Sequence, residues 1–108
     1  MILNDGLYQG EQIVPKDWID STRVVDDAYR DRFAKSDHGV MLPGGHYKNY
    51  MWVANPEEMM CIGIYGQTIH INRKTGVVIV KFSSFPKPAD ELMFANTFIL
   101  LASVSISV

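Results

Sequence analysis

The sequence has little cysteine and no excess of charge of either sign. One of its 108 residues is a cysteine, Cys61, so no disulfide can form within the chain. Ten basic residues stand against twelve acidic ones, which gives a formal net charge of -2. Binding to nucleic acid or to anionic lipid needs a concentrated basic surface, and none is visible here. We therefore expect an ordinary globular domain that does not bind nucleic acid.

The sequence also lacks a recognisable metal-binding pattern. Its three histidines, His38, His46 and His70, share no ligand spacing with one another or with the single cysteine. Cys61 lies in an apolar run, where a lone cysteine is typically a small buried hydrophobic residue. We expect neither a metal ion nor another cofactor.

Long apolar runs are scarce as well. Residues 92–108 carry no charge, but they include Asn96, Thr97 and three serines and are shorter than a membrane span. We expect a helix that packs on a sheet. The opening "MILNDG" resembles the last turn of a helix with Gly6 at its cap, or a short strand, and has no features of a secretory signal.

Between the ends, the hydrophobic pattern changes from helical to alternating. Helices are predicted over about 15–24 and 26–34, and the Gly- and Pro-containing stretch 36–45 is predicted to be a loop. β-Branched and aromatic runs then predict antiparallel strands around 50–54, 60–65, 67–72 and 77–82. Asp90 and Glu91 favour the start of a final helix. The predicted fold class is α+β, with three to four strands and a C-terminal helix packed on them.

Lys74-Thr75-Gly76 matches a signature triplet of penicillin-binding proteins and serine β-lactamases. In those enzymes the triplet lies on a strand beside the active site. Here it separates two predicted strands and ends in a glycine that can take a positive φ. We therefore predict that 74–76 form a hairpin loop and not a catalytic strand.

Two further matches to the same enzymes are also interpreted as coincidental. Ser84 and Lys87 fit Ser-x-x-Lys, but Lys87 precedes Pro88, which disfavours the helix that would hold the lysine near the serine. Tyr47-Lys48-Asn49 fits Tyr-x-Asn. The three matches follow one another in the wrong order for that family.

Three other blocks, in order, carry a wider resemblance: "MILNDGLYQGEQIVPKDWIDSTR", "YKNYMWV" and "GIYGQTIHINRKTGVVIVKFSSFP". Over nearly the whole chain they resemble the C-terminal portion of the β-lactamase-related serine hydrolases. The resemblance is greatest to the branch of 6-aminohexanoate-dimer hydrolases and class C-like esterases. It implies a part of the β-lactamase/transpeptidase-like fold.

The resemblance also implies a site. In this branch a glycine-containing strand just before Tyr65-Gly66-Gln67 takes the place of the Lys-Thr-Gly strand. The backbone N–H of Ile64 would then be one oxyanion-hole donor, and Gly63 would leave room for the substrate. Without the resemblance, Gly63 and Gly66 would be read as marking a bulge or relieving crowding.

The resemblance further implies substrate-binding roles for Cys61, Tyr65 and Trp52. Trp52 and Tyr65 would line an acyl pocket, although aromatic residues at strand spacing are often part of a core. Cys61 stands where the triplet of β-lactamases has lysine. This favours a small ester or amide as substrate over a carboxylate-bearing β-lactam.

The serine, lysine and tyrosine of the family's catalytic centre have no counterpart in this sequence. The resemblance therefore implies a single domain, 1–108, that is the C-terminal fragment of a larger hydrolase. Its partner would be the missing catalytic part, and exposed sheet surface could lead to self-association. The alternative from the residues alone is a self-sufficient small α+β interaction or sensor module.

Overall fold

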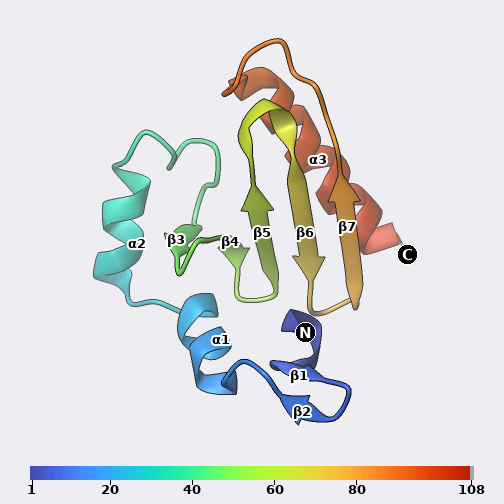
Figure 1. Cartoon of the computed structure of the whole chain (residues 1–108). Coiled ribbons are helices and arrows are strands. Elements are labelled where there is room, and N and C mark those ends of the chain that lie inside the picture. Colours follow the sequence, from blue (N-terminus) through green and yellow to red (C-terminus); the bar gives the residue numbers. More distant parts are fainter. Residues whose placement is uncertain (108) are drawn as a thin grey trace.

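The computed structural model describes residues 1–107 and has an α+β fold, as predicted. Five antiparallel strands form the main sheet in the order β3-β4-β5-β6-β7, so that each strand pairs with the next one in sequence (Figure 1). The strands are β3 (His46–Lys48), β4 (Met51–Asn55), β5 (Glu58–Ile62), β6 (Thr68–Asn72) and β7 (Val77–Lys81). Short connections of this kind are typical of a meander.

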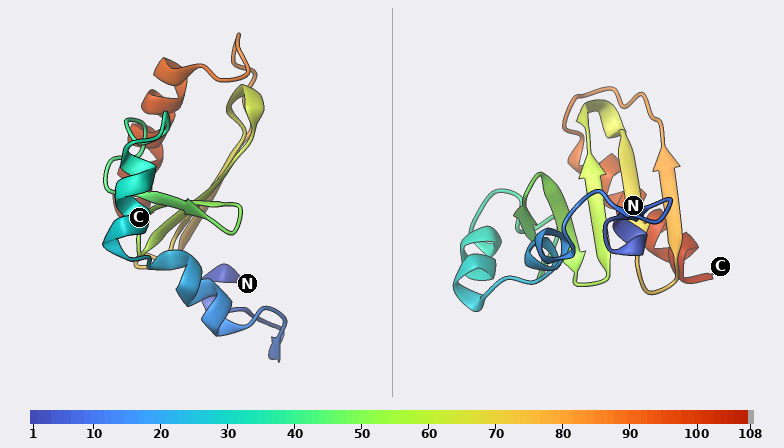
Figure 2. Two further views of the ribbon diagram at one scale, coloured as in Figure 1. Left: turned by 90° about the vertical axis from the view of Figure 1, so that its left-hand side faces the viewer. Right: turned by 60° about the horizontal axis from the view of Figure 1, so that its bottom comes forward.

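Three α-helices accompany the sheet: α1 (Lys16–Arg23), α2 (Asp27–Ala34) and α3 (Glu91–Ser107). Asp26 caps α2 by accepting a hydrogen bond from the backbone N–H of Tyr29 at 2.8 Å. Asp90 does the same for Met93 at the start of α3, at 3.2 Å. In the edge-on view of Figure 2, α2 and α3 lie on the same side of the sheet.

The sheet has one strand more than the upper end of the predicted range. The β-type run at residues 47–54, of which only 50–54 was predicted as a strand, is divided by a tight turn at Asn49 and Tyr50, both of which have a positive φ (54° and 65°). Two central residues with positive φ are typical of the hairpin turn that matches the twist of the flanking strands. β5 also ends at Ile62, three residues before the predicted end.

The N-terminal segment differs more from the prediction. Residues Ile2–Asn4 form one turn of 3-10 helix, η1, and Asp5, not Gly6, is its left-handed cap with φ 54°. A small hairpin follows, formed by β1 (Leu7–Tyr8) and β2 (Glu11–Gln12), which the hydrophobic pattern did not predict. Strands of two residues carry too little alternation to be recognised in a sequence.

The two faces of the sheet are covered differently. On one face Met51, Val53, Met59 and Ile71 form a core cluster against which Ile2, Leu3 and Cys61 pack. The other face lies under α3, which contributes four buried residues, Phe94, Thr97, Leu101 and Ser105. The buried side chain of Asn72 donates a hydrogen bond to Ser105 Oγ at 3.2 Å. The C-terminal run is thus a helix packed on the sheet, as predicted.

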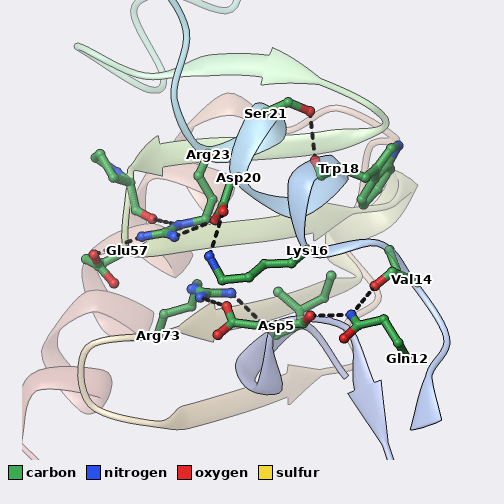
Figure 3. A network of polar contacts seen from close by, with 12 residues as sticks. Asp5, Gln12, Val14, Lys16, Trp18, Asp20, Ser21, Arg23, Glu57 and Arg73 are labelled. Atoms are coloured by element: carbon green, nitrogen blue, oxygen red, sulfur yellow. Dashed lines mark hydrogen bonds and ion pairs between the residues drawn. The ribbon is translucent and has the colours of Figure 1, made fainter.

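A network of charged side chains fastens the N-terminal elements to the turns of the sheet (Figure 3). On α1, Arg23 contacts Glu57 in the β4–β5 turn at 3.0 Å, and Asp20 at 3.1 Å. After β6, Arg73 donates to the backbone oxygen of Ile2 at 2.6 Å and is also paired with Asp5. Both arginines are mostly buried, which makes these pairs less exposed to screening by water than ordinary surface pairs.

Among residues 1–107, no helix is both long enough and apolar enough to cross a membrane.

Candidate functional site

A cavity of about 310 Å³ lies between the end of β5, the loop before β3 and the first turns of α3. We call it the first cavity. Its walls are mainly apolar and include Leu42, Trp52, Ile62, Phe94 and Phe98. The charged side chains at its lining are both acidic, Asp37 and Glu91, and a cavity of this size and character suits a small organic ligand.

Gly63 and Ile64 form part of the wall of the first cavity. Gly63 continues the extended backbone of β5, and its N–H donates to the oxygen of Gln67 at 2.8 Å. Tyr65 N–H donates to the oxygen of Pro88 at 3.0 Å. Between them, the N–H of Ile64 has no acceptor within the described chain. The wall of the first cavity therefore includes a residue, Ile64, whose backbone N–H is unpaired within residues 1–107 and whose two neighbours have their N–H groups bonded.

The turn that follows holds this donor in place through an unusual backbone. Tyr65 has φ 59° and Gly66 has φ 90°, so two successive residues adopt left-handed conformations. A Cβ on Gly66 would come within 2.5 Å of Phe85 Cζ, a distance that a real side chain cannot adopt. Gly66 is therefore required for two separate reasons, its φ and the close approach of Phe85.

Gln67 clamps the segment after β7 onto this turn. Its side-chain nitrogen donates to Ser83 O at 2.5 Å, and its side-chain oxygen accepts from Ser83 N–H at 3.0 Å. Phe85 N–H then donates to Tyr65 O at 3.1 Å. The family resemblance pointed to Tyr65-Gly66-Gln67 but not to these partners, because Ser83 and Phe85 are far away along the chain and belong to no recognisable motif.

The structure brings three of the five predicted site residues together. Trp52, Gly63 and Ile64 all line the first cavity. Cys61 lies on the other face of the sheet, where its Sγ is 3.6 Å from Met51 Sδ, and burial raises the pKa of its thiol. Tyr65 directly follows Ile64 in the sequence, but it is 41% exposed and does not line the first cavity. Substrate binding by Cys61 and Tyr65 stays a prediction.

Trp52 is the centre of a group of aromatic rings. Tyr47, its partner across the β3–β4 pair, lies with its ring centroid 4.7 Å away. The rings of His38 and Phe33 approach edge to face at 5.1 and 6.3 Å. Such contacts fix the orientation of the indole ring. His38 also lines the first cavity and was not identified as a site residue, since nothing near it in sequence distinguishes it from a surface histidine.

The Lys-Thr-Gly triplet lies in the β6–β7 turn, as predicted. Asn72 Oδ1 accepts hydrogen bonds from the N–H groups of Lys74 and Thr75 at 3.0 and 3.1 Å, and Gly76 has φ 74°. None of these three residues lines the first cavity. Ser84 and Lys87 are exposed in the irregular segment before α3, so no helix joins them.

Two histidines are buried away from the first cavity. Burial lowers the pKa of His46, whose Nε2 is 2.6 Å from Thr22 O. Burial also lowers the pKa of His70, although the Glu58 carboxylate, 3.5 Å from its Nε2, acts in the opposite direction. In the part of the chain that the structure covers, no three His, Cys, Asp or Glu side chains are grouped in a way that could hold a metal ion.

Two known proteins are similar to this chain in sequence or structure. The chain is 34% identical over 90 residues to the 6-aminohexanoate-dimer hydrolase of Paenarthrobacter ureafaciens, a match that covers 82% of this chain. A solved structure of a proposed 6-aminohexanoate-dimer hydrolase from Bacillus anthracis superposes on 96% of the chain with a TM-score of 0.68 and 29% identity. The chain is related to the C-terminal portion of the 6-aminohexanoate-dimer hydrolases. It shares the β-lactamase-like fold of these proteins.

The relationship concerns only a part of each hydrolase. The chain spans 22% of the length of the Paenarthrobacter ureafaciens hydrolase and 25% of the Bacillus anthracis chain. No protein-family model matches the sequence.

Proposed function

We propose that this chain is the C-terminal section of a serine hydrolase that cleaves small esters or amides through an acyl-enzyme. The section contributes one oxyanion-hole donor, the N–H of Ile64, and a wall of the acyl-binding cavity. The nucleophilic serine, its lysine and the tyrosine base come from the part of the hydrolase that the chain does not span. The single domain 1–108 is then inactive by itself.

The free donor at Ile64 is the observation that carries this proposal. When a serine oxygen attacks an ester or amide carbonyl, the carbonyl oxygen becomes an oxyanion, and the acyl-enzyme forms as the protonated leaving group departs. A backbone N–H that already lacks an acceptor needs no rearrangement to bind that oxyanion. The contacts of Gly63 and Tyr65 with Gln67 and Pro88 fix the flanking peptide groups.

The lining of the first cavity supports the substrate class. Trp52, Ile62 and Phe94 offer an apolar surface for an acyl chain, and Gly63 adds no side chain above it. Asp37 and Glu91 would repel a substrate that carries a carboxylate in this position. The site therefore favours acyl groups without negative charge.

A chimeric enzyme tests the donor. In it, this chain replaces the matching segment of the Paenarthrobacter ureafaciens hydrolase, and ester and amide hydrolysis is measured. Ile64→Pro, which removes the N–H, is expected to lower kcat by about 10²–10³-fold, the cost of one oxyanion donor. Ile64→Val keeps the donor and is the matched control. Full activity in an Ile64→Pro chimera that melts normally would show that Ile64 is not the donor.

The isolated chain provides a second, independent test. It is expected to release no p-nitrophenol from short-chain esters above the buffer blank, because a serine needs an adjacent base. Esterase activity that Ser84→Ala abolishes would overturn the proposal that the nucleophile lies elsewhere. It would also show that the interpretation of Ser84 and Lys87 as a coincidental match is wrong.

A further inference from the structure

A second cavity, of about 580 Å³, lies on the far side of Trp52 from the helix α3. Trp52 and His38 line both cavities and form the wall between them. The other walls of the second cavity come from α2 and β3, so it shares no element with the Gly63–Ile64 segment. Of its lining residues the proposed hydrolase function uses only Trp52, so the second cavity is a separate candidate site.

Aromatic rings make up most of the lining of the second cavity. Besides Trp52 and His38, the rings of Tyr29, Phe33 and Tyr47 face it. The hydroxyl of Tyr29 donates to Tyr47 O at 2.7 Å, which ties α2 to β3 across the cavity. Rings held in this way are pre-organised to receive the face or edge of another planar ring.

The charge of the second cavity is opposite to that of the first. Its one charged lining residue is Arg32, whose guanidinium carbon lies 5.5 Å from the centroid of the Tyr29 ring. A second cation, Lys48 Nζ, lies 6.0 Å from that centroid. The first cavity, in contrast, has only Asp37 and Glu91 as charged lining residues. The second cavity therefore attracts an anion.

Arg32 also differs from the other arginines of the described chain in having no acidic partner. Arg23, Arg30 and Arg73 each form ion pairs with Asp or Glu side chains. Within residues 1–107, Arg32 has no carboxylate within ion-pair distance. A guanidinium next to an aromatic cavity can pair with the two oxygens of a ligand carboxylate in a fixed geometry.

We infer that the second cavity binds a small planar aromatic carboxylate, with its ring among Trp52, Phe33 and Tyr47 and its carboxylate on Arg32. The volume lies within the range of small-molecule sites. A cage for an organic cation would need the same aromatic rings, but Arg32 in the lining and Lys48 near the Tyr29 ring oppose that ligand by repulsion. The inference does not depend on the proposed hydrolase function.

Titration of the chain with benzoate tests the inference, with Trp52 fluorescence as the signal. The chain has two tryptophans, so a Trp18→Phe background leaves Trp52 as the only reporter. Benzoate is expected to change the emission in a saturable way and to bind more tightly than benzyl alcohol, which is neutral, and benzylammonium, which is a cation. Tighter binding of benzylammonium, or no saturable change with benzoate, would overturn the inference.

Arg32→Gln identifies the anchoring charge. A hydrogen-bonded charge pair contributes enough to affinity that benzoate binding should weaken about tenfold to a hundredfold, while the binding of benzyl alcohol should stay unchanged. Lys35→Gln is the matched control, because Lys35 follows α2 and is exposed but does not line the cavity. Equal weakening by both substitutions would mean that general surface charge, and not a site at Arg32, holds the ligand. Circular dichroism confirms that each variant is folded.

Discussion

Phe85 and Gly66 are in direct contact, and the ring occupies the space where any side chain on residue 66 would lie. Gly66→Ala should therefore destabilise the fold for two reasons. A left-handed backbone costs a residue with a side chain about 1–2 kcal/mol. Displacement of the buried Phe85 ring adds to this, so we expect a loss of more than about 2 kcal/mol in the free energy of unfolding. Denaturant titration measures it.

Gly76→Ala is the matched control for the Gly66 prediction. Gly76 has a similar positive φ, 74°, but nothing lies within 4 Å of the position of its missing Cβ. The substitution should cost only the backbone strain, about 1–2 kcal/mol. Equal losses in the two variants would mean that the contact with Phe85 adds nothing.

Gln67→Ala should release the segment that follows β7. The substitution removes both hydrogen bonds to the backbone of Ser83, and leaving such groups without partners costs about 1–3 kcal/mol. We expect a lower melting temperature together with faster amide hydrogen exchange at Ser83 and Phe85. Gln67→Glu keeps the acceptor for Ser83 N–H but replaces the donor with a carboxylate oxygen that faces Ser83 O, so it should also destabilise this segment. Unchanged amide hydrogen exchange at Ser83 and Phe85 in Gln67→Ala would show that Gln67 does not hold this segment in place.

Stability should fall as the pH decreases below about 6.5, partly because of His70. Burial lowers the pKa of His70 in the folded chain below the usual 6.5. At a pH between the lowered pKa and 6.5, His70 therefore binds a proton in the unfolded chain but not in the folded chain. The free energy of unfolding then decreases with decreasing pH, by at most about 1.4 kcal/mol per pH unit for one proton. The decrease should end at the lowered pKa of the folded chain.

His70→Asn should make this pH dependence shallower, whatever it does to stability at pH 8. His46, whose pKa burial also lowers, remains and accounts for the rest of the slope. An unaltered slope in His70→Asn would show that His70 does not contribute.

The sheet face opposite α3 should lead to self-association of the isolated chain. Ile69, Val78 and Val80 are 40%, 50% and 56% exposed, and β7 is an edge strand. Val78→Thr combined with Val80→Thr keeps β-branched side chains but reduces the apolar area, so the average mass in light scattering should decrease. Val40→Thr, in an exposed loop, is the control. A monodisperse monomer before any substitution would contradict the prediction.

The local sequence pattern was sufficient to predict most of the helices and strands. The predicted helices, the strands from Met51 to Lys81 and the hairpin loop at 74–76 depend on interactions between near neighbours in sequence, and all are present. The extra strand β3 was missed because Asn49 and Tyr50 turn within a continuous β-type run. Tyrosine at a positive φ is rare, so no propensity favours a turn there.

The candidate site was predictable only in part. Resemblance to a hydrolase family pointed to Gly63 and Ile64 before any geometry was known, and the structure places both at the first cavity together with Trp52. Alternation along β5 would have indicated that Cys61 and Ile62 face opposite sides of the sheet. The sequence could not say which side carries the cavity, because that depends on where α3 packs.

The sequence by itself determined the α+β class, the order of most elements and the turn position of Lys74-Thr75-Gly76, since these follow from spacing, propensity and turn chemistry. Only the tertiary structure decided that Gln67 binds Ser83, that Phe85 fills the space at Gly66 and that Arg32, without an ion-pair partner in the described chain, lies beside five aromatic rings. These contacts join residues far apart in the chain. Such contacts leave no periodic signal, because each depends on how the separate elements pack and not on the neighbours of either residue.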